Sequence, residues 1–177
     1  MKYVAFLRGI NVGGNSIIRM DELKVAVNNI GFTNVKTYTQ SGNVIFESDI
    51  EDVIKIREEL EKSLSDTFAM DLRIVVRTYE ELKKVLKDAP IEWKRANDLR
   101  CYIAFVKEPV TPKDVLKEIH LKEGVDFVKK GEYVVYMSTK LEGLTHSGFT
   151  ELVGTSVYKD ITIRSFNAIR KLLKRME

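Results

Sequence analysis

The sequence predicts an α+β fold in which two ferredoxin-like (βαββαβ-type) halves, each with a mainly antiparallel sheet, pack into one compact unit. Two internal repeats indicate a duplication. Residues 3–8, YVAFLR, recur 99 positions later as YIAFVK, and residues 35–48 match the apolar pattern of residues 125–138 at an offset of 90. The third observation is the order of elements, because each half begins with a strand, a helix, a hairpin and a helix.

The elements of the first half follow from its apolar periodicity and its turn signals. Ser41-Gly42 separates two strand-like segments and therefore indicates a tight hairpin. Ser48 and Glu51 have the spacing of a capping box at the start of a helix. The expected elements are strand 3–8, a helix with the inward stripe Met20, Leu23, Val27 and Ile30, strands 35–40 and 43–47, a helix from Ser48 to Phe68, strand 72–77, and a helix capped by Thr78 and Glu81 that ends near Lys87.

The second half repeats this order after a break in the pattern. The segment DAPIEWKRANDL, 88–99, fits neither the helical nor the strand period. The predicted organisation is a first half at 1–88 with a Gly-rich loop, a linker at 89–99, and a second half at 100–177 with a basic C-terminal helix. The expected elements are strand 101–107, a helix with Thr111 as cap and Pro112 at its first position, hairpin 125–138, a helix near 146–153, and a helix at 165–176 striped by Phe166, Ile169, Leu173 and Met176.

Several strands are apolar on both faces, as in YVAFL and YVVYM. An antiparallel sheet usually leaves one face in contact with water, so these faces need a cover. We expect the two halves to cover each other. The alternative is a dimer interface, and the sequence leaves the oligomeric state open.

The composition, 44% hydrophobic and 31% charged over 177 residues, is that of a globular protein with one domain or two small ones. A net charge of +3 permits acidic partners without requiring them. With one cysteine, Cys101, and two histidines, no disulfide framework, metal site or cofactor is predicted. No apolar stretch approaches the roughly 18 residues of a membrane span, so a cytoplasmic location without a membrane partner is expected.

The segment AFLRGINVGGNS, residues 5–16, contains an extension that the second half lacks. The offset between the halves falls from 99 at the first strand to 92 at the first helix, which is a difference of seven residues. The second half makes the same connection with VKEPVT. Since the fold does not require the extra residues, the Gly-rich loop is the leading candidate for a functional element.

The loop resembles a P-loop in spacing but not in chemistry. Gly9 and the GNS at 14–16 fit the pattern G-x-x-x-x-G-K-[ST], except that Asn15 replaces the lysine that reaches the terminal phosphates. The predicted sheet is antiparallel, whereas P-loop proteins have parallel strands, so a nucleoside triphosphatase is not expected. Two interpretations remain: an anion site, in which glycine amides act with Arg8 and Arg19, or a plain structural turn.

Ferredoxin-like topology brings this loop and the first hairpin turn, TQSGN at 39–43, to the same end of the sheet. The turn is rich in hydrogen-bond donors and acceptors, and its counterpart in the second half is KKGE at 129–132. We expect a small anionic or phosphorylated ligand here, stabilised by Arg8 and loop amides. No residue stands out as a general base, so an enzymatic activity stays open. The predicted ligand-binding residues are Arg8, Asn11, Gly13, Gly14, Asn15, Ser16, Arg19, Gln40, Ser41 and Asn43.

Two phrases, AFLRGINVGG at 5–14 and TYTQSGNVIF at 37–46, resemble a bacterial family of unknown function. Its members begin with this Arg-Gly-Ile-Asn-Val-Gly-Gly phrase and carry a TYxQSGNVxF hairpin. The resemblance extends over essentially the whole chain and implies two similar α/β halves but no established activity. Family members end in Arg-Asn-Trp-Asn-Thr followed by Lys-Leu; Arg164 and Asn167 match that phrase, whereas Ser165, Phe166 and Ala168 depart from it.

Two other functions are alternatives to the anion site. The order of elements is also that of an RRM, but KGEYVVY at 130–136 keeps only the Lys-Gly start and a valine of the RNA-binding signature. An RNA-binding module requires exposed aromatic side chains, the candidates being Tyr3, Tyr102, Tyr133 and Tyr136. An interaction scaffold without a small ligand instead predicts a flat, open loop end.

Hydrolytic chemistry finds little support in the sequence. His120 lies in KEIHLKEG, where a surface position at a helix end is expected. His146 precedes Ser147, but adjacent residues seldom orient as a nucleophile and its base, and no nucleophile elbow is present. We interpret Thr145–Ser147 as a helix cap.

Overall fold

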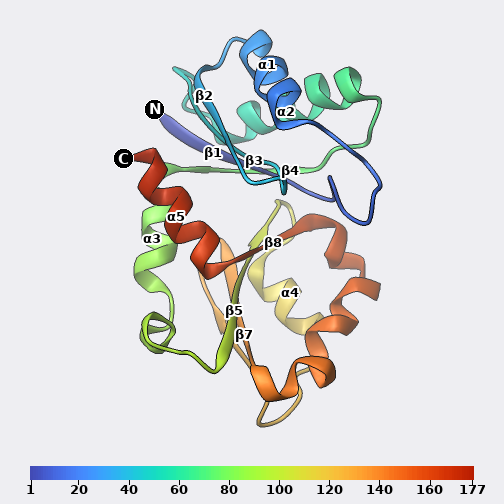
Figure 1. The fold of residues 1–177 in the computed structure, drawn as a ribbon, viewed down its shortest axis with the longest axis vertical. Coiled ribbons are helices and arrows are strands. Elements are labelled where there is room, and N and C mark those ends of the chain that lie inside the picture. The colour runs from blue at the N-terminus through green and yellow to red at the C-terminus, as the bar shows by residue number, and fades with distance from the viewer. The chain divides into compact units, whose positions relative to one another are not determined.

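The computed structural model describes residues 1–177 and contains two four-stranded sheets with helices packed against them (Figure 1). Every strand pairing is antiparallel. The chain divides into two compact units: one comprises Met1–Leu82 together with Leu172–Glu177, and the other comprises Lys83–Lys171. None of the helices has both the length and the hydropathy needed to cross a membrane.

The first sheet has the strand order β2-β3-β1-β4, which is that of a ferredoxin-like unit. At the centre of its ladder, Ala5 pairs with Val44 on one side and Val76 on the other. The elements in chain order are β1 (Lys2–Leu7), α1 (Met20–Ile30), β2 (Thr33–Tyr38), β3 (Asn43–Glu47), α2 (Val53–Phe68), β4 (Ile74–Thr78) and α3 (Tyr79–Asp88).

The second sheet has the equivalent order, β6-β7-β5-β8, and this confirms the predicted α+β class with two ferredoxin-like halves. The short helix η1 lies within the predicted linker. The elements are η1 (Ile91–Lys94), β5 (Leu99–Val106), α4 (Pro112–Glu118), β6 (Asp126–Lys130), β7 (Val134–Lys140), η2 (Leu141–His146), η3 (Gly148–Gly154), η4 (Ser156–Asp160), β8 (Ile161–Ser165) and α5 (Phe166–Met176).

The second half differs from the sequence prediction between β7 and α5. The helix expected near 146–153 is replaced by the 3₁₀ helices η2, η3 and η4, and Gly148 and Gly154 in this segment both disfavour an α-helix. The strand β8 was not predicted, because five residues that include Arg164 give a weak strand pattern.

The strand ladders correct the alignment of the two hairpins. Ala5 pairs with Val44, and its repeat Ala104 pairs with Val135, so β3 and β7 correspond at an offset of 91 rather than 90. Successive strand residues point to opposite faces, so a shift by one residue exchanges the two faces. The corrected offset places Val44 and Val135 on the helix-facing side of their sheets.

Each half carries an arginine at the same position of its last strand. Arg77 lies opposite Val4, and Arg164 lies opposite Ile103, the repeat of Val4. Each Nη1 donates to the carbonyl oxygen of the residue before it, at 2.7 Å and 3.1 Å respectively. Burial lowers the pKa of Arg164 to about 10, so the guanidinium stays charged at neutral pH. Arg164 is therefore a strand residue, and the helix that follows begins at Phe166.

The core of the first unit lies between one face of its sheet and helices α1 and α2 (Figure 1). Alternate strand residues belong to this core, whereas Val4, Phe6, Ile45 and Val75 between them are buried on the other face of the sheet. The main side chains are Tyr3, Ala5, Leu7, Val44, Phe46, Ile74 and Val76 from the strands, Leu23 and Val27 from α1, and Ile56, Leu60 and Leu64 from α2. Both helices were predicted from these apolar spacings.

The start of α2 differs from the predicted capping box. Asp52 is the N-cap, since its side chain accepts hydrogen bonds from the amides of Ile54 and Lys55. Ser48 instead accepts from the amide of Ile50 and forms a turn before the helix. By contrast, the capping boxes at Thr78/Glu81 and at Thr111 are confirmed.

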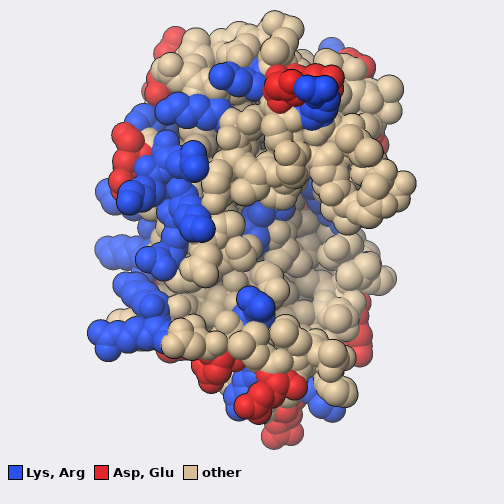
Figure 2. All heavy atoms as spheres, in the orientation of Figure 1, with Lys and Arg blue, Asp and Glu red and all other residues tan.

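The helix α5 has an apolar stripe and a basic face. Leu172 is its buried leucine, whereas the predicted Leu173 is half-buried. Its exposed residues include Arg170, Lys171, Lys174 and Arg175, and basic side chains gather over this helix in the space-filling view (Figure 2). The last turn belongs to the first unit: Lys2 Nζ donates to the Met176 carbonyl at 2.6 Å, and the Arg175 guanidinium lies 4.7 Å from the ring centre of Tyr38.

Candidate functional site

The Gly-rich loop between β1 and α1 folds back on itself as a short finger. Asn15 N donates to Val12 O at 3.1 Å, and Asn11 N donates to Ser16 O at 3.0 Å. The chain reverses through left-handed conformations, with φ of 59° at Gly13 and 78° at Gly14. Residues with a Cβ rarely adopt such values, which explains the two glycines at the tip.

The base of the finger is held by the side chain of Asn11. Its Nδ2 donates to the carbonyl oxygens of Ile18, at 3.0 Å, and Gln40, at 2.8 Å. Its Oδ1 accepts from the amide of Ile18 at 2.8 Å. Ile10 and Ile18 beside it are 2% and 1% exposed and belong to the core of the first unit. Asn11 is therefore used to hold the finger closed.

The structure bears out the seven-residue difference between the halves. The connection covers residues 8–19 between β1 and α1, but only residues 107–111 between β5 and α4. The extra residues make the finger and place Ile10 over the β2–β3 turn, where a Cβ on Gly42 would lie 2.6 Å from Ile10 Cδ1. Loop and turn thus meet at one end of the sheet, as the topology predicts.

The polar residues of the β2–β3 turn mainly hold the turn itself. The buried Asn43 donates through Nδ2 to Tyr38 O, Thr39 Oγ1 and Ser41 Oγ, at 3.0, 2.9 and 3.2 Å. Ser41 Oγ also shares a 2.8 Å hydrogen bond with Thr39 Oγ1. Gln40 is exposed, and its carbonyl accepts from Asn11. Short polar side chains commonly close turns in this way.

The two predicted arginines occupy different electrostatic settings. Arg19 makes a bidentate ion pair with Asp21, with distances of 3.1 Å and 2.8 Å, and lies 4.0 Å from Glu22. The hydrogen bonds from Arg19 hold the pKa of Asp21 below its usual value, so the first turn of α1 carries negative charge beside that arginine. Arg8 is half-buried at the foot of the finger, where its amide donates to Arg73 O at 3.0 Å.

The groups that remain for a ligand lie at the tip of the finger. Gly13, Gly14, Asn15 and Ser16 are all exposed. The amides of Gly13 and Gly14 donate no hydrogen bond within the chain. The tip therefore presents free backbone donors on a finger whose base is held by the hydrogen bonds of Asn11.

The aromatic side chains considered for RNA stacking do not lie on an open sheet face. Tyr3 is fully buried and donates its hydroxyl to Ile50 O at 2.7 Å. Tyr136 is 1% exposed and donates to Val85 O at 2.7 Å. Tyr102 and Tyr133 are half-buried. None of the four candidate tyrosines is therefore exposed in the way that RRM-like stacking requires.

Neither histidine hydrogen-bonds to Ser147, the nucleophile considered from the sequence. His120 Nδ1 lies 3.7 Å from Glu151 Oε2 on the surface, and His146 Nδ1 shares a 3.0 Å hydrogen bond with Thr145. Ser147 instead donates its hydroxyl to Asp126 Oδ1 at 2.7 Å and accepts from the amide of Phe149. Ser147 is therefore a structural cap. No cluster of three or more His, Cys, Asp or Glu side chains is arranged to hold a metal ion.

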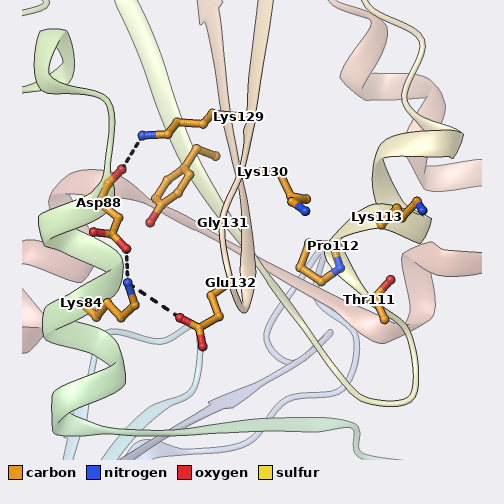
Figure 3. Close-up of a pocket in the computed structure, with 10 residues that line it drawn as sticks. Lys84, Asp88, Thr111, Pro112, Lys113, Lys129, Lys130, Gly131 and Glu132 are labelled. Atoms are coloured by element: carbon orange, nitrogen blue, oxygen red, sulfur yellow. Dashed lines mark hydrogen bonds and ion pairs between the residues drawn. The ribbon is translucent and has the colours of Figure 1, made fainter.

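A second candidate lies at the loop end of the second half, where the sequence indicated only a turn equivalent to the β2–β3 turn. A cavity of about 620 Å³ opens between the β6–β7 turn, the start of α4 and the last turns of α3 (Figure 3). Four lysines and two carboxylates contribute to its wall. The residues are Lys84, Asp88, Thr111, Pro112, Lys113, Lys129, Lys130, Gly131, Glu132 and Tyr136. The only sign of this cavity in the sequence was the connection between β5 and α4, which is seven residues shorter than the connection between β1 and α1.

The fold and these loop ends define a protein of two tandem ferredoxin-like units, one with a glycine finger and one with an open cationic cavity. The chain belongs to the family described as "Protein of unknown function (DUF1697)", whose model matches residues 1–136. Both phrases that carry the resemblance lie in this range, and Arg164–Asn167 lies beyond it.

A solved structure, the conserved bacterial protein SP0830 from Streptococcus pneumoniae, is similar to the chain in fold. The TM-score is 0.87 at 24% sequence identity, over 99% of this chain and 98% of the other. No curated protein matches the sequence.

Proposed function

We propose that the protein binds a small anionic or phosphorylated ligand at the tip of the finger in the first half. The observation that carries the proposal is the extension itself, which the second half lacks and which presents the free amides of Gly13 and Gly14. Converging amides beside a positive charge are a recurrent way of holding an anion.

The proposed ligand contacts are fewer than the predicted set. The exposed residues Gly13, Gly14, Asn15 and Ser16 offer their backbone amides and the Asn15 side chain, and the half-buried Arg8 supplies positive charge at the foot of the finger. Asn11, Gln40, Ser41 and Asn43 instead help to hold the loop and the turn in place, through hydrogen bonds within the finger and the turn. Arg19 contributes less, since Asp21 neutralises it.

The test is a thermal-shift screen against inorganic phosphate, nucleotides and sugar phosphates with the wild type and Arg8→Ala. A ligand present at 100 times its Kd stabilises the folded state by about 2.7 kcal/mol, which such a screen detects. The expected result is a shift in the wild type that disappears in Arg8→Ala. Lys24→Ala, which removes an exposed charge from α1, is the matched control and should keep the shift.

A second candidate function is protein docking through the same finger. Val12 and Ile17, which flank the tip, are 66% and 67% exposed and give the finger an apolar surface that a protein partner could cover. Docking needs no free anion, so the absence of a shift with every small molecule would refute the anion site and favour this function.

A further inference from the structure

The face of the second sheet that points away from α4 carries aromatic and polar side chains. In the β6–β7 ladder, Phe127 pairs with Ser138. Two residues further along, Lys129 pairs with Tyr136. Cross-strand partners point to the same side of a sheet, and so do residues two apart on one strand, so these four side chains share one face. The strand residues between them belong to the core that packs against α4, on the opposite face.

Trp93 of η1 packs on this face and fixes part of it. Its ring lies edge-on to that of Tyr136, with 5.8 Å between the ring centres, and edge-on to Phe166 at 5.3 Å. All three rings are buried. The Tyr136 hydroxyl donates to Val85 O at 2.7 Å, so the rings of Trp93 and Tyr136 are both held in place.

A cavity of about 560 Å³ lies beside these rings, between η1, the end of α3 and β6. Its volume is within the range of small-molecule sites, about 300–1,000 Å³. Phe127 and Ile91 line it although they are 49% and 78% exposed, and Trp93 and Tyr136 contribute to its wall. The cavity therefore offers aromatic and aliphatic carbon to a ligand.

Ser138 is the polar point in this wall. It lines the cavity, is 4% exposed, and lies on the same face as its partner Phe127. Its hydroxyl makes no hydrogen bond within the chain. A buried hydroxyl without a partner is unfavourable, and nearly all such groups in native proteins are paired. A ligand atom in the cavity would supply the missing partner.

The charges around the cavity balance one another. Two lysines, Lys87 and Lys129, and two acidic residues, Asp88 and Glu92, contribute to its wall. Lys129 Nζ donates to the backbone carbonyl of Asp88 at 2.8 Å, and the Asp88 carboxylate lies 2.6 Å from Lys84 Nζ (Figure 3). Because the wall carries no net charge, the cavity favours a neutral ligand over an anion.

We propose that this cavity binds a neutral, planar heteroaromatic molecule, whose ring packs against Trp93 and Phe127 and whose ring nitrogen bonds to Ser138. A serine hydroxyl both donates and accepts, so it pairs with a ring N–H or with an unprotonated ring nitrogen. Aromatic walls supply contact area, and one placed hydroxyl fixes the orientation of the ligand. The site lies in the second half and does not depend on the anion site proposed for the finger.

The test is a titration with benzimidazole at pH 8, where this molecule is neutral, followed by the fluorescence of Trp93, the single tryptophan of the chain. We expect a saturable change in emission. Phe127→Ala should lower the affinity at least fivefold, because an aromatic contact is lost. Ser138→Ala should lower it about twofold to tenfold, because one neutral hydrogen bond is lost. Indene, which has the same shape without nitrogen, should bind more weakly and be insensitive to Ser138→Ala.

Three controls separate this site from other causes. Leu121→Ala removes an exposed apolar side chain of the same unit outside the cavity and should leave the affinity unchanged. Arg8→Ala should also leave it unchanged, whereas it abolishes anion binding at the finger if the proposed function holds. Benzoate, a planar anion, should bind more weakly than benzimidazole. An emission change that does not saturate, tighter binding of benzoate, or an affinity that either Phe127→Ala or Ser138→Ala retains would overturn the proposal.

Discussion

Asn11 is the residue on which the shape of the finger depends, and Asn11→Ala tests this. The substitution removes the two hydrogen bonds donated by Nδ2 and the one accepted by Oδ1. It also places alanine at a φ of 55°, a left-handed conformation that asparagine tolerates better. Both changes destabilise the folded state relative to the unfolded chain.

The magnitude follows from these contacts. Each hydrogen bond contributes about 0.5–1.5 kcal/mol net, and the bond to Gln40 lies at the low end because water can replace it. The left-handed backbone costs alanine about 1 kcal/mol more. The expected loss in the free energy of unfolding is therefore about 3 kcal/mol.

The assay is urea denaturation followed by far-UV circular dichroism, with hydrogen exchange of the Ile18 amide as the local measurement. Asn15→Ala is the matched control, since the exposed Asn15 side chain makes no hydrogen bond, and it should change stability by less than about 0.5 kcal/mol. The reasoning is refuted if Asn11→Ala is as stable as Asn15→Ala and the Ile18 amide exchanges at the wild-type rate.

Three further predictions concern the second half. Gly148→Ala should destabilise the protein by about 3 kcal/mol or more in urea denaturation, because its Cβ would lie 1.7 Å from His120 O, whereas Gly154→Ala, whose Cβ meets nothing within 4 Å, should be tolerated. Burial acts to raise the pKa of Asp126, but hydrogen bonds from the Lys122 amide, the Ser147 hydroxyl and the Gly148 amide outweigh it and lower that pKa below its usual value. The ionised carboxylate therefore contributes stability at pH values above the pKa it has in the unfolded chain. That contribution is lost as the pH falls through the lower pKa of the folded state. Asp126→Asn should therefore cost much more stability at pH 7 than at pH 2.5. Burial raises the pKa of Cys101 to about 11, so iodoacetamide at pH 8 should alkylate it about 100-fold more slowly than an exposed cysteine, as mass spectrometry can follow.

Much of the fold was predictable because the chain repeats a strong pattern. The strands at Tyr3 and Tyr102 are apolar and aromatic, and the caps at Thr78 and Thr111 have specific spacings to their partners. The failures have local causes. Ser48 has the spacing of a cap, but a serine bonds equally well to the amide two residues on, and Asp52 competes for the helix start.

The second half was harder to predict between residues 141 and 165. Three short 3₁₀ helices lack the 3.6-residue period, and Gly148 is required there by a close approach to His120 rather than by a local turn signal. The strand β8 includes the largely buried Arg164, a charge that sequence patterns assign to the surface. Such positions are fixed by tertiary contacts, which a single sequence does not display.

The sequence predicted where the Gly-rich loop lies, but not which of its polar groups bond within the chain. Topology correctly brought the loop and the β2–β3 turn together. The sequence does not reveal whether Asn11 or Asn43 bonds to the chain or to a ligand, because the amide has the same chemistry in both cases. The sequence did not predict the cavity beside Lys130. The connection between β5 and α4 is short, and a short connection gives no sign in the sequence that space is left beside it.

The grouping of Leu172–Glu177 with the first unit has a consequence for synthesis on the ribosome. The segment Met1–Leu82 leaves the exit tunnel first, but its partner helix turn, which holds Lys2 through the Met176 carbonyl, is translated about 90 residues later. At roughly 5–20 residues per second, this interval lasts on the order of 5–20 s. The nascent first unit therefore lacks the turn that covers Lys2 until the whole second unit has emerged.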